Sequence, residues 1–351
     1  MLYSLDEICL IPSTSSGVEH RGDVNVLTNK NNYPIFTAPM ASIVDDGNFK
    51  VLKEHHLNVI IPRSVDWNTR MALLKTGNWV AFGYKEAQHL YEHLELEYFT
   101  VDENHKIRIC IDQANGHMES LLKLCKDLKE RFGNNIKLMT GNIANPYAYK
   151  LYAMAGVDYV RVGIGSGNVC TTSVQTGMHY PMGSLITKLK EEKEFVKKAI
   201  ELKASYRTVP KIIADGGFKR IDQCVKALAL GADFVMLGEI IAKSDEACGE
   251  IVAERNKYGF KSREYFGMST EKAQILVNDA SLFKVDNFVP KHSEGQVKTV
   301  DVEYKLSEWI GDFEHALRSS MSYSGARRLE EFIGKVNWDT MTPVTYKAYM
   351  K

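Results

Sequence analysis

Residues 211–238 read KIIADGGFKRIDQCVKALALGADFVMLG and indicate most directly how the chain folds. Two short apolar runs, 211–214 and 234–237, enclose a stretch that is long enough for one helix. Short apolar runs bounded by glycine and polar residues are typical of buried strands. A strand, a helix and a second strand in succession predict one parallel β–α–β unit.

Six further runs of the same kind precede this unit, at residues 35–38, 58–61, 79–82, 107–111, 137–140 and 159–162. Helical stretches separate them. In one such stretch, residues 120–131 (SLLKLCKDLKER), the apolar side chains recur at the spacing of one helix face. The resulting eight strand–helix repeats favour an α/β fold of the (β/α)8 barrel type. An open, doubly wound sheet is the structural alternative.

We expect a single domain over residues 1–351, with an N-terminal extension before the barrel and two additions after its last strand. Residues 257–305 form a long polar stretch with few periodic apolar positions. Such a stretch is typical of a lid, a binding loop or disorder, and we predict a flap here. Residues 306–333 are predicted to form a C-terminal helical element.

Charge, cysteine content and hydropathy exclude several classes of protein. The 44 basic residues balance the 44 acidic ones, so no net field attracts nucleic acid and any phosphate must be recognised locally. The six cysteines form no CxxC pair and no zinc-ligand spacing, which favours a reducing compartment. We find neither a signal peptide nor an apolar run of membrane-spanning length, and therefore expect a cytoplasmic protein without membrane contact.

Polar and glycine-rich residues follow several of the predicted strands. In (β/α)8 barrels the loops after the carboxyl ends of the strands carry the active site. We therefore expect one common site built from these loops. They are Asp112-Gln113-Ala114-Asn115-Gly116, Gly141-Asn142, Gly163-Ile164-Gly165-Ser166-Gly167, Asp215-Gly216-Gly217 and Gly238-Glu239.

The segment 163–172 reads GIGSGNVCTT and ends in a candidate nucleophile, Cys170. Its glycines allow tight turns, so that backbone N–H groups can bind an anion or carbonyl groups can bind a cation. A thiolate at Cys170 can attack an electrophilic carbon. Most free cysteines are small buried core residues, and the residues alone leave both interpretations open.

Two other candidate groups also have alternatives. Loops after the seventh and eighth barrel strands often bind phosphate through backbone N–H groups, and Asp215 would then accept ribose hydroxyls. Asp215 can equally cap a helix. Glu294, which precedes Gly295 in the long polar stretch, is either a proton carrier under a lid or a solvated surface carboxylate.

Taken in order, these segments resemble the IMP dehydrogenase and GMP reductase family from about residue 5 to about residue 333. LDEICLIP (5–12) resembles the N-terminal element of the family, and GIGSGNVCTT resembles its catalytic cysteine loop. IADGG (213–217) and FVMLG (234–238) resemble its phosphate-binding strands. YFGMS (265–269) resembles its purine-contacting segment.

The resemblance implies a purine 5'-monophosphate substrate that forms a covalent adduct with Cys170 at the C2 carbon. A nicotinamide dinucleotide would give or take a hydride at that carbon. Thr172 and Glu294 would handle protons at the departing amino group. The resemblance further implies that the nucleotide contacts Asn168, Asp215, Gly216, Gly217, Gly238, Glu239, Gly267, Met268 and Ser269.

The same resemblance implies the remaining ligand contacts. A monovalent cation, K+, would bind at Gly165 and Gly167, and the family's usual assembly is a homotetramer. Arg21 and the segment with Ser319 would act across a subunit boundary. Residues expected to contact the dinucleotide are Asp112, Gln113, Ala114, Asn142, Arg21, Arg63, Ser319 and Ser322.

Within the family, four features favour the reductase over the dehydrogenase. DQANG (112–116) and GMSTE (267–271) resemble reductase motifs, and SEG (293–295) with KTV (298–300) resembles a third with two residues inserted. Residues 271–290 contain no arginine, whereas the dehydrogenase flap needs one. We therefore predict an NADPH-dependent GMP reductase that forms IMP and ammonia. An IMP dehydrogenase-like enzyme, or one with altered base choice, is the first alternative, and a non-catalytic nucleotide-binding barrel is the second.

Four positions depart from the family pattern and indicate a divergent member. Asn168 stands where the family has a phosphate-binding serine, and Ser173 replaces an arginine. Ala41 replaces an aspartate. Glu239 stands where a small residue is usual, and a carboxylate beside a phosphate dianion repels it.

Overall fold

The computed structural model describes residues 2–99, 102, 106–254, 259 and 261–349. Eight parallel strands form one sheet in the order β2-β9-β8-β7-β6-β5-β4-β3. Each predicted strand run overlaps one of them. The strands are β2 (Ile35–Thr37), β3 (Ile60–Ile61), β4 (Trp79–Phe82), β5 (Ile107–Asp112), β6 (Ile136–Ile143), β7 (Tyr159–Val162), β8 (Lys211–Asp215) and β9 (Phe234–Leu237).

Strand β2 and the residues just before β3 close this sheet into a barrel. Phe36 and Asn58 form a parallel bridge. The Thr37 N–H donates to the Asn58 carbonyl at 3.0 Å, and the Asn58 N–H donates to the Ile35 carbonyl at 3.0 Å. The predicted (β/α)8 barrel is confirmed. The open-sheet alternative is wrong, because an open sheet leaves its two edge strands apart.

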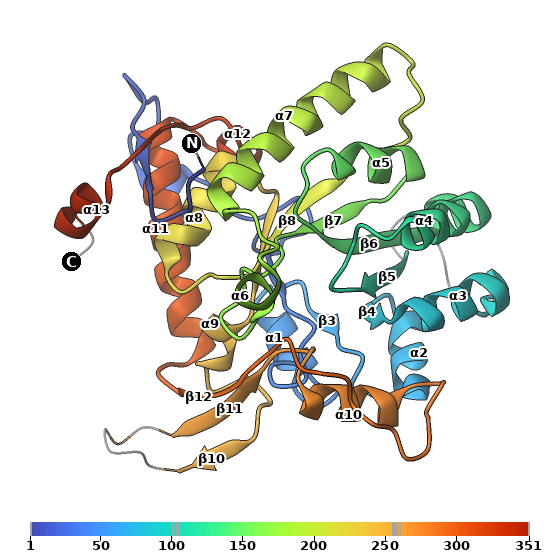
Figure 1. The fold of residues 1–351 in the computed structure, drawn as a ribbon. Helices are drawn as coiled ribbons and strands as arrows, with labels where there is room; N and C mark the ends of the chain where they lie inside the picture. The colour runs from blue at the N-terminus through green and yellow to red at the C-terminus, as the bar shows by residue number, and fades with distance from the viewer. Residues whose placement is uncertain (1, 100–101, 103–105, 255–258, 260, 350–351) are drawn as a thin grey trace.

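Helices surround the barrel (Figure 1). The predicted amphipathic stretch lies in the fourth of them and buries its expected face, Leu121, Leu124, Cys125 and Leu128. A last helix, α11 (Leu306–Ser324), packs against α8. The others are α1 (Phe49–Glu54), α2 (Trp67–Lys75), α3 (Tyr84–His93), α4 (Glu119–Phe132), α5 (Ala148–Ala155), α7 (Met182–Glu201) and α8 (Ile221–Leu230).

An aromatic cluster fills the amino-terminal end of the barrel. The rings of Trp79, Tyr159 and Phe234 come from the first residues of β4, β7 and β9 and surround Phe36. Phe36 and Phe234 have ring centroids 5.0 Å apart at 68°, which is an edge-to-face arrangement. Because this end is packed with apolar rings, a site for a polar ligand can only open at the carboxyl ends of the strands.

The segment predicted as a flap, 257–305, is partly regular. Residues 257, 258 and 260 of that prediction lie outside the described residues. The rest contains α10 (Glu271–Ala280) and two strands, β11 (Ser262–Phe266) and β12 (Val297–Asp301). With β10 (Ile251–Ala253), which precedes the segment, these two strands form an antiparallel sheet. Its function as a lid stays a prediction.

The remaining elements are small. α11 and α12 (Leu329–Phe332) lie within the range predicted to be helical, and β1 (Ile8–Ile11) pairs with β13 (Asn337–Thr340) ahead of α13 (Pro343–Tyr349). Within the described ranges, every helix is too short or too polar to cross a lipid bilayer.

Candidate active site

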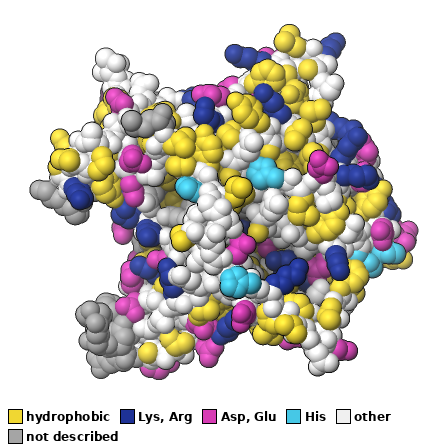
Figure 2. Space-filling view, viewed as in Figure 1, with side chains coloured by type: hydrophobic (Ala, Val, Ile, Leu, Met, Phe, Trp, Pro, Cys, Tyr) yellow, Lys and Arg dark blue, Asp and Glu magenta, His cyan; other side chains and the backbone are white. Residues whose placement is uncertain are grey.

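A cleft of about 1450 Å³ opens at the carboxyl ends of the barrel strands. Figure 2 shows the molecule from the side of Figure 1, with histidine, basic and acidic side chains exposed near the centre of this face. The cleft brings together residues that are far apart in sequence. Of the predicted site residues, those lining it are Arg63, Asp112, Gln113, Ala114, Asn142, Gly165, Gly167, Asn168, Cys170, Thr172, Asp215, Gly216, Gly217, Gly238, Gly267, Met268, Ser269 and Glu294.

Cys170, Thr172 and Glu294 form a hydrogen-bonded line beside the cleft. The Cys170 thiol donates to Thr172 Oγ1 at 3.3 Å, and the Thr172 hydroxyl donates to Glu294 Oε2 at 2.7 Å. Cys170 is partly exposed, so it is not a buried core residue. Glu294 is a hydrogen-bonded carboxylate rather than a freely solvated one. The candidate nucleophile and the candidate proton-carrying pair thus lie within contact distance of one another.

Backbone pairing between two distant segments produces this line. The Thr171 N–H donates to the Glu294 carbonyl at 2.9 Å, and the Gln296 N–H donates to the Val169 carbonyl at 2.9 Å. Cys170 and Gly295 form an antiparallel bridge between them. The cysteine loop and the end of the flap segment therefore behave as two short strands. No local pattern in either segment predicts this pairing.

The buried cysteines lie in a different environment. Burial raises the pKa of Cys110 and of Cys125 to about 12, so both remain protonated thiols at neutral pH. Of the cysteines in the chain, all of which lie among the described residues, Cys170 is the one that lines the cleft.

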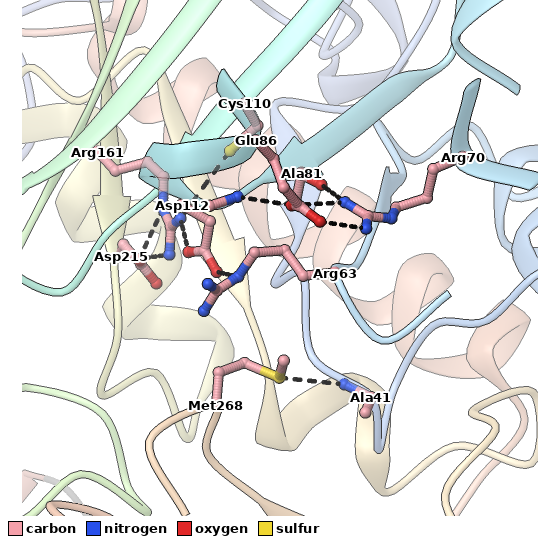
Figure 3. A network of polar contacts seen from close by, with 11 residues as sticks. Ala41, Arg63, Arg70, Ala81, Glu86, Cys110, Asp112, Arg161, Asp215 and Met268 are labelled. Atoms are coloured by element: carbon pink, nitrogen blue, oxygen red, sulfur yellow. Dashed lines mark hydrogen bonds and ion pairs between the residues drawn. The ribbon is translucent and has the colours of Figure 1, made fainter. Parts of the chain in front are cut away.

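Arg161 of β7 holds two carboxylates at the mouth of the barrel (Figure 3). Its Nη1 donates to Asp112 Oδ1 at 2.6 Å, and its Nη2 donates to Asp215 Oδ2 at 2.8 Å. Arg63 Nε donates to the other Asp112 oxygen at 3.1 Å. Asp112 of β5, Asp215 of β8 and the two arginines thus form one network on the cleft floor.

Electrostatic attraction shifts the pKa values of Arg161 and Asp112 in this buried network toward their charged forms. Burial alone would lower the pKa of Arg161, but Asp215 and Asp112 outweigh it and raise that pKa well above its usual value. Burial would likewise raise the pKa of Asp112, but Arg161 and Arg63 hold it below the ordinary range. A cation between two anions compensates the loss of hydration of all three groups.

Asp215 is oriented for a ligand rather than for a helix. Asn142 Nδ2 and Arg161 both donate to its Oδ2, at 2.7 Å for the amide. Among the described residues nothing donates a hydrogen bond to Oδ1, which leaves it for hydroxyl groups in the cleft. Helix α8 starts at Ile221, with Arg220 at its cap position. The helix-cap interpretation of Asp215 is therefore wrong.

Sequence reasoning missed the contribution of Arg161. The residue was assigned only to the strand run 159–162 (YVRV). An arginine at an alternating position inside an otherwise apolar run was the available signal, because a charge that enters a barrel requires partners there. The sequence did not reveal which partners those were.

Glycines of the loops after β8 and β9 also line the cleft. Gly216 and Gly217 have φ values of +105° and +85°, and a Cβ on Gly217 would lie 2.7 Å from the Ser166 carbonyl oxygen. A Cβ on Gly238 would lie 2.7 Å from the Tyr265 hydroxyl. Only glycine fits such close approaches, and loops of this kind expose backbone N–H groups to anions.

Glu239, predicted to contact the nucleotide, is not among the cleft-lining residues. It begins the short helix α9 (Glu239–Ala242), directly after Gly238. Its charge still acts on the cleft-lining Tyr265, so the predicted repulsion of a phosphate by Glu239 stays a prediction. A positively charged side chain also lies near the cleft. Lys298 Nζ donates to the carbonyl of the cleft-lining Asn168 at 2.6 Å.

Arg21, Ser319 and Ser322 also lie outside the cleft lining. Arg21, in the short 3-10 helix Arg21–Asp23, contacts His315 of α11 at 2.7 Å. Ser322 donates to the Val18 carbonyl at 3.4 Å. One chain alone therefore does not bring these residues to the other predicted dinucleotide contacts. Their contribution across a subunit boundary stays a prediction.

The predicted cation loop uses its carbonyls internally. The Gly165 carbonyl accepts from the Ser173 hydroxyl at 3.1 Å, and the Gly167 carbonyl accepts from the Cys170 N–H at 3.0 Å. Ser173 thus satisfies a carbonyl that the resemblance reserved for a cation. This arrangement does not fit K+ well, and the reaction proposed for Cys170 does not require K+.

Comparisons with known proteins show which family the chain belongs to. The family model described as IMP dehydrogenase / GMP reductase domain matches residues 97–348. GMP reductase 2 of Homo sapiens is 32% identical over 236 residues, which are 67% of this chain and 61% of that protein. GMP reductase of Onchocerca volvulus is 30% identical over 69% of this chain and 60% of its own length. GMP reductase of Aliivibrio salmonicida is 30% identical over 307 residues, 85% of this chain and 80% of that protein. The chain thus spans about 60% of the length of the human and nematode relatives.

Proposed function

Because the chain belongs to the IMP dehydrogenase/GMP reductase family, we propose that it is an oxidoreductase that reductively deaminates GMP to IMP and ammonia. The observation that carries the proposal is the line from Cys170 through Thr172 to Glu294 at the edge of the cleft. It combines a nucleophile with a proton carrier, as the removal of an amino group requires.

The chain's residues would act in the following order. The Cys170 sulfur bonds to C2 of the purine, and its proton passes toward Thr172 and Glu294. The C2–N bond would then break, and the amino group would leave as ammonia after it takes a proton from this pair. A bound NADPH would supply the hydride that C2 accepts. The sulfur–carbon bond would finally break, which would release IMP and return Cys170 as a thiolate that regains its proton from solvent.

In the proposed reaction, different loops of the cleft would bind the nucleotide and the nicotinamide. The loops of Gly217 and Gly238 would bind the phosphate through backbone N–H groups, and Asp215 Oδ1 would accept ribose hydroxyls. Asp112 and the adjacent Gln113 would border the nicotinamide. A cleft of about 1450 Å³ exceeds the roughly 300–1,000 Å³ of an ordinary small-molecule site, which supports two ligands side by side.

A panel of purine monophosphates with NADPH and with NAD+ tests the proposal. We expect GMP to consume NADPH, as followed by the absorbance of reduced nicotinamide, and to yield IMP and ammonia. The Cys170→Ala variant should lose turnover, whereas Cys9→Ala, which alters a cysteine in β1 outside the cleft, should retain it. Consumption of NADPH with another purine nucleotide but not with GMP would disprove the substrate assignment.

The same panel separates the alternatives. An IMP dehydrogenase would form XMP from IMP with NAD+, but the absence of arginine from residues 271–290 argues against water activation by a flap. A non-catalytic nucleotide-binding barrel would be stabilised against heat by GMP without any turnover. Turnover that disappears in Cys170→Ala would exclude this last possibility.

A further inference from the structure

Contacts on two sides hold the part of the flap segment that bears Glu294. The cysteine loop makes the contacts on one side only. On the other side lies α10, whose Gln274 side chain reaches the backbone of Lys291. Gln274 Nε2 donates to the Lys291 carbonyl at 3.0 Å, and the Lys291 N–H donates to Gln274 Oε1 at 2.8 Å. One side-chain amide thus makes the same two bonds with Lys291 that a neighbouring strand would make.

This contact lies close to the chemistry. Lys291 precedes Glu294 by three residues, and Gln274, Lys291 and Glu294 all line the cleft. Gln274 Nε2 also donates to the Ser269 carbonyl at 3.0 Å, in the segment after β11. The amide therefore joins the parts of the flap segment just before and after α10 to that helix. A shift of α10 would shift the backbone that carries Glu294.

Helix α10 is in turn attached to the barrel by a buried ion pair. Arg70 of α2 makes two hydrogen bonds with Glu86 of α3, at 2.7 and 3.0 Å, and Arg70 is 0% exposed (Figure 3). At the end of α10, the Ser281 hydroxyl donates to Glu86 Oε1 at 3.0 Å, and Arg70 Nη2 donates to the Ala280 carbonyl at 3.4 Å. The pair therefore fastens the end of α10 to two barrel helices.

The attachment is rigid on the barrel side. Arg70 Nη1 also donates to the Ala81 carbonyl of β4 at 3.0 Å, and Glu86 Oε2 accepts the Gly83 N–H at 3.0 Å. A guanidinium whose donors are shared between a carboxylate and backbone carbonyls has little freedom to move. A continuous set of contacts thus runs from β4 through Arg70, Glu86 and α10 to Gln274 and Glu294.

We propose that Gln274 is a positioning residue, which holds Glu294 in contact with Thr172 by fixing the backbone at Lys291. The inference rests on the proposed function, because it assumes that Glu294 handles protons. Gln274 itself would touch no reacting atom. The Arg70–Glu86 pair would serve the same purpose one step further away, by fixing α10.

The test compares Gln274→Met with Gln274→Glu. Methionine has a similar length but no amide, whereas glutamate keeps the acceptor for the Lys291 N–H. The matched control is Gln88→Met. Gln88 is exposed on α3, and its side chain makes no hydrogen bond with the described residues. Amide hydrogen exchange of residues 289–296 in the ligand-free protein measures the position of the flap, and kcat and KM for GMP measure its consequence.

In Gln274→Met we expect exchange at residues 289–296 to become faster by roughly five- to tenfold. We expect kcat to fall by about tenfold or more, while KM for GMP stays within about twofold, because misplaced proton carriers slow chemistry more than binding. Gln274→Glu should lie between Gln274→Met and the wild type, and Gln88→Met should match the wild type in both measurements.

Unchanged exchange in Gln274→Met would overturn the inference, as would faster exchange with unchanged kcat. A loss of kcat in Gln274→Glu as large as in Gln274→Met would also contradict it. Failure of the proposed function is detected separately by Glu294→Gln. If that variant turns over GMP like the wild type, Glu294 carries no proton, whatever the exchange at residues 289–296 shows.

Discussion

At the scale of single residues, the charge balance of the cleft depends on one arginine. Its acidic partners lie far from it in the sequence. Arg161 enters the barrel from β7 and compensates Asp112 and Asp215, which come from β5 and β8. All three side chains are at most 14% exposed. An ion pair this deep contributes little compared with well-packed apolar residues, but the loss of one partner leaves a buried charge.

We therefore expect Arg161→Met to destabilise the protein by about 3–5 kcal/mol, because two buried carboxylates lose their partner. Urea unfolding at neutral pH measures the change in the free energy of unfolding. Adding Asp112→Asn to this variant should recover part of the loss, since it removes one of the unpaired charges. A change below about 1 kcal/mol would show that water or a rearranged Arg63 replaces the Arg161 contacts.

Thiol reactivity provides a second prediction at this scale. Iodoacetamide at mildly alkaline pH should alkylate Cys170, which is partly exposed, but not Cys110 or Cys125, whose pKa burial raises to about 12. GMP should protect Cys170 while the label on Cys9 persists. Peptide mass spectrometry identifies the modified residues. Equal protection of Cys9 and Cys170 would indicate a global effect rather than occupancy of the cleft.

At the scale of elements, the loops after β8 and β9 require glycine for reasons of geometry. Gly217 adopts a positive φ, and its Cα approaches the Ser166 carbonyl so closely that no Cβ fits. The absence of a side chain lets this loop pack against the cysteine loop while both line the cleft.

Gly217→Ala should lower the affinity for GMP by at least about tenfold, because the loop must shift to relieve the contact and the strained φ. Isothermal titration with GMP measures this affinity. The matched control is Gly311→Ala, at an exposed position of α11 where a new Cβ meets nothing within 4 Å. That control should bind GMP normally and gain up to roughly 1 kcal/mol of stability. Normal GMP binding by Gly217→Ala would exclude this loop from the phosphate site.

At the scale of the whole molecule, buried ion pairs connect elements around the barrel and determine how its stability depends on pH. Burial would raise the pKa of Asp233, but Lys193 and Lys211 hold it below its usual value. Glu86 is likewise held low by Arg70, against the effect of burial. With Asp112, such groups distribute charge pairs over α2, α3, β5, β7, β8 and α7.

These carboxylates make stability depend on pH in a defined direction. Each has a lower pKa in the folded state than in the unfolded chain, where the values are about 4. The unfolded state therefore binds more protons as the pH falls, and the stabilisation present at neutral pH is lost progressively below about pH 5. Urea unfolding at pH 7, 5 and 4 should show a steadily decreasing free energy of unfolding. A flat profile would contradict the ion-pair geometry.

Several features of the molecule were determined by the sequence alone. Eight apolar runs, each followed by polar or glycine-rich residues, were sufficient to predict the barrel, because strand burial and loop composition are local properties of the chain. The same locality identified the cysteine loop and the glycines after β8 and β9, whose chemistry depends on residue type. The order of these motifs was also sufficient to place the chain in its family.

Only the tertiary structure decided which of these groups act together. The bridge between Cys170 and Gly295, the contacts of Arg161, and the amide of Gln274 on Lys291 join residues that lie 17 to 125 positions apart. Gly238 lines the cleft whereas Glu239 does not, and Ser173 donates to a carbonyl that was expected to hold a cation. Such pairings depend on how closed strands and helices bring distant side chains within about 3 Å, and no local pattern of residues encodes that distance.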